Sequence, residues 1–138
     1  MAGSGYSGKA LGQKLGLKPW MRVKTRNAPG RYQQLLGPLP DDVVISTRLR
    51  RPVDLIHIFS IARAHLVGEL RIAMKEIEEN GAIWVSWPKK ISGVETDITE
   101  DVIREVALPM GLVDVKVCAV DETWSGLKLV IRKAIRRS

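Results

Sequence analysis

Residues that build disulfide frameworks and metal sites are scarce in this sequence. Among 138 residues there are one cysteine, Cys118, and two histidines. A single cysteine cannot form an internal disulfide, and so few Cys and His side chains disfavour a zinc site. Aromatic residues amount to 5%, and the sequence carries no helix-turn-helix or RNP signature, which disfavours a dedicated nucleic-acid-binding domain.

Long hydrophobic runs are also missing. No apolar stretch approaches the ~20 residues that a membrane helix needs, and the N-terminal sequence MAGSGYSGKALGQKLG lacks the apolar segment of a secretory signal. We therefore expect a cytoplasmic protein that makes no membrane contact. A chain of 138 residues with 45% hydrophobic residues is long enough for one domain with a core of its own.

Acidic residues are absent from both ends of the chain, and the net charge of +7 is concentrated there. A positive face would form if the two ends lie on the same side of the fold, and it could attract nucleic acid, acidic proteins or anionic ligands. A solvated surface that keeps a small protein soluble explains the same charge. The bases in question are Lys9, Lys14, Lys18, Arg22, Lys24, Arg26 and Arg31 at one end, and Lys128, Arg132, Lys133, Arg136 and Arg137 at the other.

The hydrophobic pattern predicts strands that alternate with helices. Residues 1–19 are expected to form a basic, glycine-rich arm or a short helix, and residues 20–138 a single α/β domain. Asn80 and Gly81 are expected to end the long helix, and Asp97 with Glu100 to form a capping box for the next one. The expected strands are 20–26, 43–46, 54–59, 82–87, 112–120 and 127–135, and the expected helices are 31–36, 62–80 and 97–110.

This order of elements predicts a three-layer domain with a mostly parallel sheet, right-handed crossovers and an antiparallel last strand. Over residues 20–135 it resembles the Rossmann-like fold of S-adenosylmethionine-dependent methyltransferases. Asp54-Leu55-Ile56-His57 takes the place of that fold's fourth strand, and the stretch from Asn80 to Val85 that of its fifth.

The motifs that would hold the cofactor of that fold are missing. The resemblance implies an acidic residue and a Gly-x-Gly turn after the first strand, where this sequence reads Arg26-Asn27-Ala28-Pro29-Gly30. It also implies an acid for the ribose hydroxyls after the second strand, where the sequence reads Ile45-Ser46-Thr47. We therefore expect no bound cofactor, with S-adenosylmethionine disfavoured, and no conventional methyltransferase activity.

Several longer motifs resemble a family of short bacterial proteins known as a domain of unknown function. They are GYSGKALGQKLGLKP, DLIHIF, GAIWVSWPKK and GLVDVKVCAVDETWSGLKLVIRK, and together they span Gly5 to Lys133. The resemblance implies the fold and a bacterial, cytosolic origin, and it brings no assigned activity or catalytic residue.

A ligand site is predicted where the parallel strands end, because open α/β sheets bind ligands at their carboxyl edge. The sequences WPKK and DETWSG should meet there. Their indoles could stack on a ligand, their lysines could bind phosphate or carboxylate, and their acids could bind hydroxyls or act as a base. Alternatively, the lysines pair with the acids and the tryptophans close the core. The candidate residues are Asn27, Trp87, Lys89, Lys90, Asp121, Glu122, Trp124 and Ser125.

No catalytic residue or metal ligand is assigned. His57 lies in an apolar strand and is expected to be a hydrogen-bonded core residue, Trp84 to be core, and Cys118 to be an inert buried thiol. A Ser86, His57 and Asp121 triad lacks the G-x-S-x-G elbow. The function predicted is a non-catalytic module that binds a small anionic ligand or a protein partner. A divergent methyltransferase and a nucleic-acid-associated basic protein are the alternatives.

Overall fold

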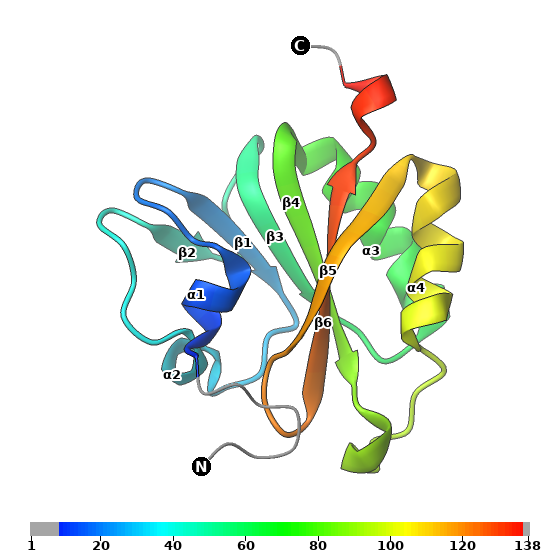
Figure 1. Ribbon diagram of the computed structural model, residues 1–138. Helices are drawn as coiled ribbons and strands as arrows, with labels where there is room; N and C mark the ends of the chain where they lie inside the picture. Colours follow the sequence, from blue (N-terminus) through cyan, green and yellow to red (C-terminus); the bar gives the residue numbers. More distant parts are fainter. Residues whose placement is uncertain (1–8, 137–138) are drawn as a thin grey trace.

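The computed structural model describes residues 9–136, which form one six-stranded sheet with helices on both faces (Figure 1). The strands are β1 (Arg22–Arg26), β2 (Val44–Ser46), β3 (Val53–Phe59), β4 (Ile77–Pro88), β5 (Leu112–Ala119) and β6 (Trp124–Ile131). The α-helices are α1 (Leu11–Leu15), α2 (Tyr32–Leu36), α3 (Arg63–Glu76) and α4 (Glu100–Ala107). Three 3-10 turns are η1 (Lys90–Ser92), η2 (Leu108–Met110) and η3 (Lys133–Ile135).

The strand order is β2-β1-β3-β4-β6-β5. Strands β2, β1, β3 and β4 pair in parallel, whereas β6 is antiparallel to both of its neighbours, β4 and β5. The predicted antiparallel last strand is therefore confirmed, and β5 points in the same direction as β4. The α/β, Rossmann-like fold class predicted from the sequence is the one observed.

Two apolar clusters lie on the two faces of the sheet. One contains Leu66, Leu70 and Ala73 of α3 and Ile103 of α4 against β3, β4 and β6. The other contains residues of α1 and α2, including Leu11 and Leu36, against the opposite face. Central strands covered on both faces must be apolar throughout, and β4 is accordingly buried from Ala82 to Pro88. Trp84 is fully buried there, as predicted.

Several predicted boundaries were wrong. The long helix ends at Glu76 rather than at Asn80, because Ile77 pairs with Val53 and starts β4 five residues early. The predicted capping box is replaced by the hydroxyl of Thr99, which accepts the Val102 N–H at 3.2 Å.

The carboxylate of Asp97 instead accepts the backbone N–H of Arg63 at 2.7 Å, and so ties the loop before α4 to the start of α3. The helix after Thr99 ends as an α-helix at Ala107, and Leu108–Met110 continues it as a 3-10 turn. The last strand covers Trp124–Ile131, three residues earlier at its start than predicted, because the hairpin turn is shorter.

The short helix α1 packs onto the sheet. Leu11 and Leu15 are buried, and Gly16 ends the helix in the left-handed region at φ 77°, where glycine is unstrained. This packing brings Lys14, the basic residue of α1, within hydrogen-bonding distance of Ala119 at the end of β5. Within residues 9–136 no helix is long and apolar enough to cross a membrane.

Candidate functional site

The two motifs predicted to meet at the carboxyl edge of the sheet do meet. The backbone N–H of Lys89 donates to the carbonyl oxygen of Thr123 at 2.7 Å. Beyond this bond, Pro88 pairs with Trp124 and Trp87 with Ser125 in the antiparallel ladder. The end of β4 and the start of β6 are thus directly hydrogen-bonded neighbours.

The two tryptophans of these motifs lie on opposite faces of the sheet. Cross-strand partners share a face and consecutive residues alternate, so Trp87 lies on the α3 and α4 side and Trp124 on the α1 and α2 side. Trp87 is only 8% exposed and belongs to the core cluster of that side. Trp124 makes an edge contact with Phe59 at 5.0 Å between ring centroids. The two indoles therefore do not form one stacking surface.

Asp121 holds the turn between β5 and β6. It is 5% exposed, and its Oδ1 accepts the backbone N–H groups of Thr123 and Trp124, each at 2.8 Å. Its neighbour Glu122 is exposed and lies 3.9 Å from the guanidinium of Arg31. Asp121 therefore stabilises the turn, and Glu122 lies at its surface beside Arg31.

The role of Asp121 can be tested by two substitutions. Asp121→Ala leaves two N–H groups without their acceptor and should lower the free energy of unfolding by about 1–3 kcal/mol. Asp121→Asn retains an oxygen that can accept both bonds and should lower it by less than about 1 kcal/mol. Urea unfolding followed by circular dichroism measures the free energy of unfolding of both variants. Equal losses would show that Asp121 stabilises the fold through its charge and not through the two hydrogen bonds of the turn.

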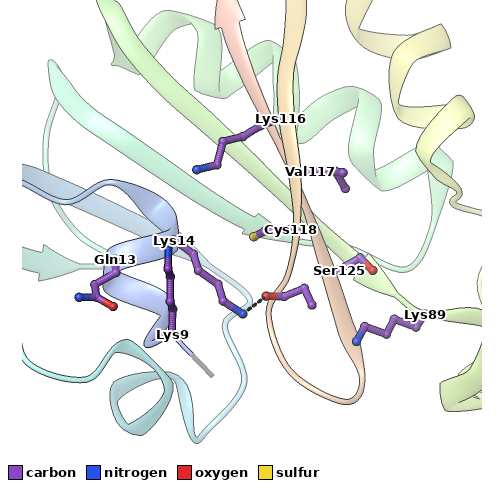
Figure 2. A pocket seen from close by; sticks show the side chains of 9 residues that line it. Lys9, Gln13, Lys14, Lys89, Lys116, Val117, Cys118 and Ser125 are labelled. Carbon is purple, nitrogen blue, oxygen red and sulfur yellow. Dashed lines mark hydrogen bonds between the residues drawn. The ribbon is translucent and has the colours of Figure 1, made fainter. Parts of the chain in front are cut away.

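A cavity of about 590 Å³ lies between α1 and the carboxyl end of β5, and four lysines converge on it (Figure 2). They come from three segments: Lys9 and Lys14 lie just before and within α1, Lys89 follows β4, and Lys116 lies on β5. We call this the lysine cavity. It is lined by Lys9, Gln13, Lys14, Lys89, Lys116, Val117, Cys118, Ala119 and Ser125.

Lys14 is the most enclosed of the four lysines. Its side chain is buried, with the residue 7% exposed, and its Nζ donates to the carbonyl oxygen of Ala119 at 2.7 Å. Burial lowers the pKa of Lys14. The neighbouring Cys118 opposes this shift, and the positive charges of Lys89 and Lys9 lower the pKa further. Burial is thus the main cause of the shift, and the neighbouring lysines act in the same direction.

The half-buried Cys118 also lines this cavity. Burial raises the pKa of its thiol, although the charges of Lys14 and Lys116 oppose that rise. At neutral pH it is therefore a thiol rather than a nucleophilic thiolate, and its position makes the single cysteine a reporter of the cavity.

A second, smaller cavity of about 320 Å³ lies at the switch point, where β1 has β2 on one side and β3 on the other. Two of the predicted site residues, Asn27 and Trp124, line it. Asn27 adopts a left-handed conformation at φ 60°, and its amide donates to the carbonyl oxygen of Phe59 at 3.4 Å. The full lining is Asn27, Phe59, Ser60, Ile61, His65 and Trp124.

The predicted site residues are thus divided. Lys89 and Ser125 line the lysine cavity, Asn27 and Trp124 the switch-point cavity, Trp87 and Asp121 are built into the fold, and Lys90 and Glu122 are exposed. Sequence reasoning missed Lys14 and Lys116. The sequence shows an excess of bases before residue 40, but only the packing of α1 beside β5 brings Lys14 and Lys116 to one cavity.

Ser86 and His57 are hydrogen-bonded at 2.8 Å between Oγ and Nε2, and Nδ1 of His57 bonds the hydroxyl of Tyr32 at 2.8 Å. His57 and Ser86 are completely buried. The predicted role of His57 as a hydrogen-bonded core residue is confirmed. Asp121 is engaged in its own turn, so these side chains form no catalytic triad.

Several solved structures that share this arrangement are methyltransferases. The ribosomal protein L11 methylase of Lactobacillus delbrueckii is 13% identical, with a TM-score of 0.55 over 88% of this chain and 76% of that chain. A SAM-dependent methyltransferase of Aquifex aeolicus is 15% identical, with a TM-score of 0.56 over 88% and 87%. Magnesium protoporphyrin IX methyltransferase of Synechocystis, solved with bound SAM, is 10% identical, with a TM-score of 0.59 over 89% and 76%.

These identities establish a methyltransferase-like fold and nothing about activity. No curated protein sequence matches the chain. The model of the family described as "Protein of unknown function (DUF3052)" matches residues 54–133. This match covers more than half of the chain, which therefore belongs to that family.

The side chains present do not fit S-adenosylmethionine, the cofactor that the fold implies. A carboxylate is needed for its ribose hydroxyls, but the switch-point cavity has none among its described lining residues. Arg26, at the end of β1, turns instead to the other face, where it pairs with Glu76 at 2.6 Å and Glu69 at 3.4 Å. The rings of Phe59 and Trp124 are already in contact within the crevice.

Proposed function

We propose that this protein is a non-catalytic, methyltransferase-like module that binds a small anionic ligand in the lysine cavity. The observation that carries the proposal is the convergence of four lysines from three separate segments, with no acidic side chain among the described residues that line the cavity. Ammonium groups that line one cavity attract negative charge, so this arrangement favours an anion.

Two features support binding rather than catalysis. His57 is buried in the core with both ring nitrogens hydrogen-bonded, so it cannot contact a substrate. The crevice that holds the cofactor in the fold's relatives has the wrong polar groups for it, as described above. Calorimetry with S-adenosylmethionine should therefore detect no binding, and micromolar binding would argue for the alternative, a divergent methyltransferase.

The anion-binding proposal predicts that anions raise the melting temperature in a saturable way. Phosphate, tripolyphosphate and citrate are to be compared at constant ionic strength, set with sodium chloride, because salt screens exposed charges. Each lysine that contacts the anion contributes about 1.5–3 kcal/mol, so Lys116→Ala should weaken the binding of the most effective anion about tenfold or more.

Lys75→Ala is the matched control, since Lys75 is an exposed lysine on α3 that does not line the cavity. It removes the same charge and should leave the affinity unchanged. If Lys116→Ala and Lys75→Ala weaken anion binding equally, the effect is due to net charge alone. If no anion raises the melting temperature in a saturable way, the proposal is rejected.

A further inference from the structure

The lysine cavity faces the open edge of the sheet. β5 is the last strand in the sheet order and has β6 as its only neighbour among the described strands. In an antiparallel pair, alternate residues direct their backbone groups at the partner strand and the others direct them away. Val120 donates its N–H to Trp124 on the β6 side at 2.8 Å, whereas the Ala119 carbonyl oxygen accepts from Lys14 on α1.

Val117 and Ala119 therefore direct their backbone N–H and C=O groups at the open edge. This explains why both line the lysine cavity although, in Figure 2, the side chain of Val117 points away from the lysines. The carbonyl oxygen of Ala119, which would repel an anion, is already bonded to an ammonium group. The edge thus offers N–H donors beside positive charges.

Ammonium groups and backbone N–H groups together are the donors that proteins use for phosphate. Lysine acts as a point charge, whereas planar carboxylates are matched best by the bidentate fork of arginine. None of the cavity-lining residues in the described chain is an arginine. The donor set therefore favours phosphoryl groups over carboxylates.

The number and spread of the lysines favour a chain of phosphoryl groups over a single phosphate. Four positive groups surround about 590 Å³, a volume in the range that holds a small organic ligand. A single phosphate is too small to reach lysines on all sides of a cavity of this size. Two or three linked phosphoryl groups match the spread of the lysines and the extent of the cavity.

A metal ion is not needed to hold such a chain here. Throughout residues 9–136, no group of three or more His, Cys, Asp or Glu side chains is placed to bind a metal ion. The lysines supply the positive charge that Mg²⁺ provides in sites where one or two carboxylates hold the ion against substrate phosphates. Magnesium bound to the ligand would compete with the lysines for the same oxygens.

We propose that the lysine cavity binds the phosphoryl chain of an oligophosphate without a metal ion, an inference that rests on the anion-binding function proposed above. The chain could belong to inorganic polyphosphate or to a nucleoside triphosphate, because both present the same linked phosphoryl groups. The proposal deepens that function by assigning the ligand's chemical class.

Isothermal calorimetry at constant ionic strength tests it with tripolyphosphate, ATP, phosphate and citrate. Tripolyphosphate should bind at least about tenfold tighter than phosphate or citrate, and saturating Mg²⁺ should weaken its binding about tenfold. ATP that binds much more tightly than tripolyphosphate would assign the nucleotide as the source, and equal affinity would assign the phosphoryl chain alone.

A backbone variant tests the role of the strand edge. Val117→Pro removes an N–H that points away from β6, a position where edge strands tolerate proline. It should weaken tripolyphosphate binding severalfold more than Val117→Ala, while both variants keep the parent's circular dichroism spectrum. Tripolyphosphate should also slow the alkylation of Cys118 by iodoacetamide. This rate is a second measure of binding that does not rely on the heat of binding.

The two proposals fail in different ways. If citrate and phosphate bind as tightly as tripolyphosphate and Lys116→Ala weakens all three, the phosphoryl assignment is overturned and the anion-binding function stands. If Mg²⁺ strengthens binding, the metal-free assignment is overturned. If no anion binds and none protects Cys118, both proposals are rejected.

Discussion

Replacing His57 with leucine should lower the free energy of unfolding by about 2–5 kcal/mol. The imidazole bridges two buried hydroxyls, those of Tyr32 and Ser86, at 2.8 Å each. Whichever ring nitrogen carries the proton, the other accepts, so both hydroxyls lose a partner in His57→Leu. Each buried polar group left without a partner costs about 1–3 kcal/mol. Ser86→Ala, which breaks one of the two bonds, should cost roughly half as much.

The same substitution should change how stability depends on pH. Complete burial lowers the pKa of His57 from its ordinary 6.5 to about 3. Between pH 6.5 and 3 the unfolded chain therefore binds a proton at this position that the folded chain does not. This contribution to stability is fully present above pH 6.5 and is lost as the pH falls, by about 1.4 kcal/mol per pH unit.

Urea unfolding at several pH values between 7 and 4 measures this slope. Because acidic groups contribute to the slope as well, the informative quantity is the difference between the parent protein and His57→Leu. The variant should be less stable at pH 7 and should lose less stability per pH unit than the parent. If stability falls equally with pH in the two proteins, the conclusion that His57 is buried and neutral is wrong.

The second large effect is expected at Trp84, in the middle of β4. Its ring is fully buried against the α1 and α2 side. Gly126 on the neighbouring strand leaves room for it, since a Cβ there would lie 3.3 Å from the ring. Trp84→Ala should therefore cost about 3–5 kcal/mol, as for other large aromatic residues replaced in a core.

Trp84→Phe is the matched control. The indole Nε1 is buried and has no hydrogen-bond partner among the described residues. Phenylalanine keeps most of the apolar ring and removes this N–H. The free energy of unfolding of Trp84→Phe should therefore exceed that of Trp84→Ala by at least about 2 kcal/mol. Thermal and urea unfolding measure the stability of both variants. If Trp84→Phe loses as much stability as Trp84→Ala, the indole N–H has a hydrogen-bond partner in solution.

Much of the fold could be predicted from the sequence because its signals were local. The alternation of apolar strands with an amphipathic helix predicted the parallel sheet, and the short DETWSG turn predicted the antiparallel last strand. The start of β4 could not be predicted in this way. Glu78 and Glu79 favour a helix by propensity, but the pairing of Ile77 with Val53 overrides that preference.

The candidate site was predictable only in part. That the end of β4 lies beside the β5–β6 turn followed from strand direction, and Lys89 and Ser125 were found in that way. The opposite faces of Trp87 and Trp124 depend on the register of the β4–β6 pair, which the sequence does not state. The contribution of Lys14 depends on a contact with Ala119, 105 residues away along the chain, and nothing local marks it.

The strand order has a consequence for when the lysine cavity can form. β6 is made last of the strands, yet it lies inside the sheet between β4 and β5. Until residues 124–131 have been synthesised, β5 has no strand to join, and Lys116 cannot be placed near Lys14. The contact of Lys14 with Ala119 also joins residues 105 positions apart, and such non-local contacts form slowly, so the cavity should form late in folding. A nascent chain that stops before β6 would retain α1, β1 and β3 but would have no lysine cavity.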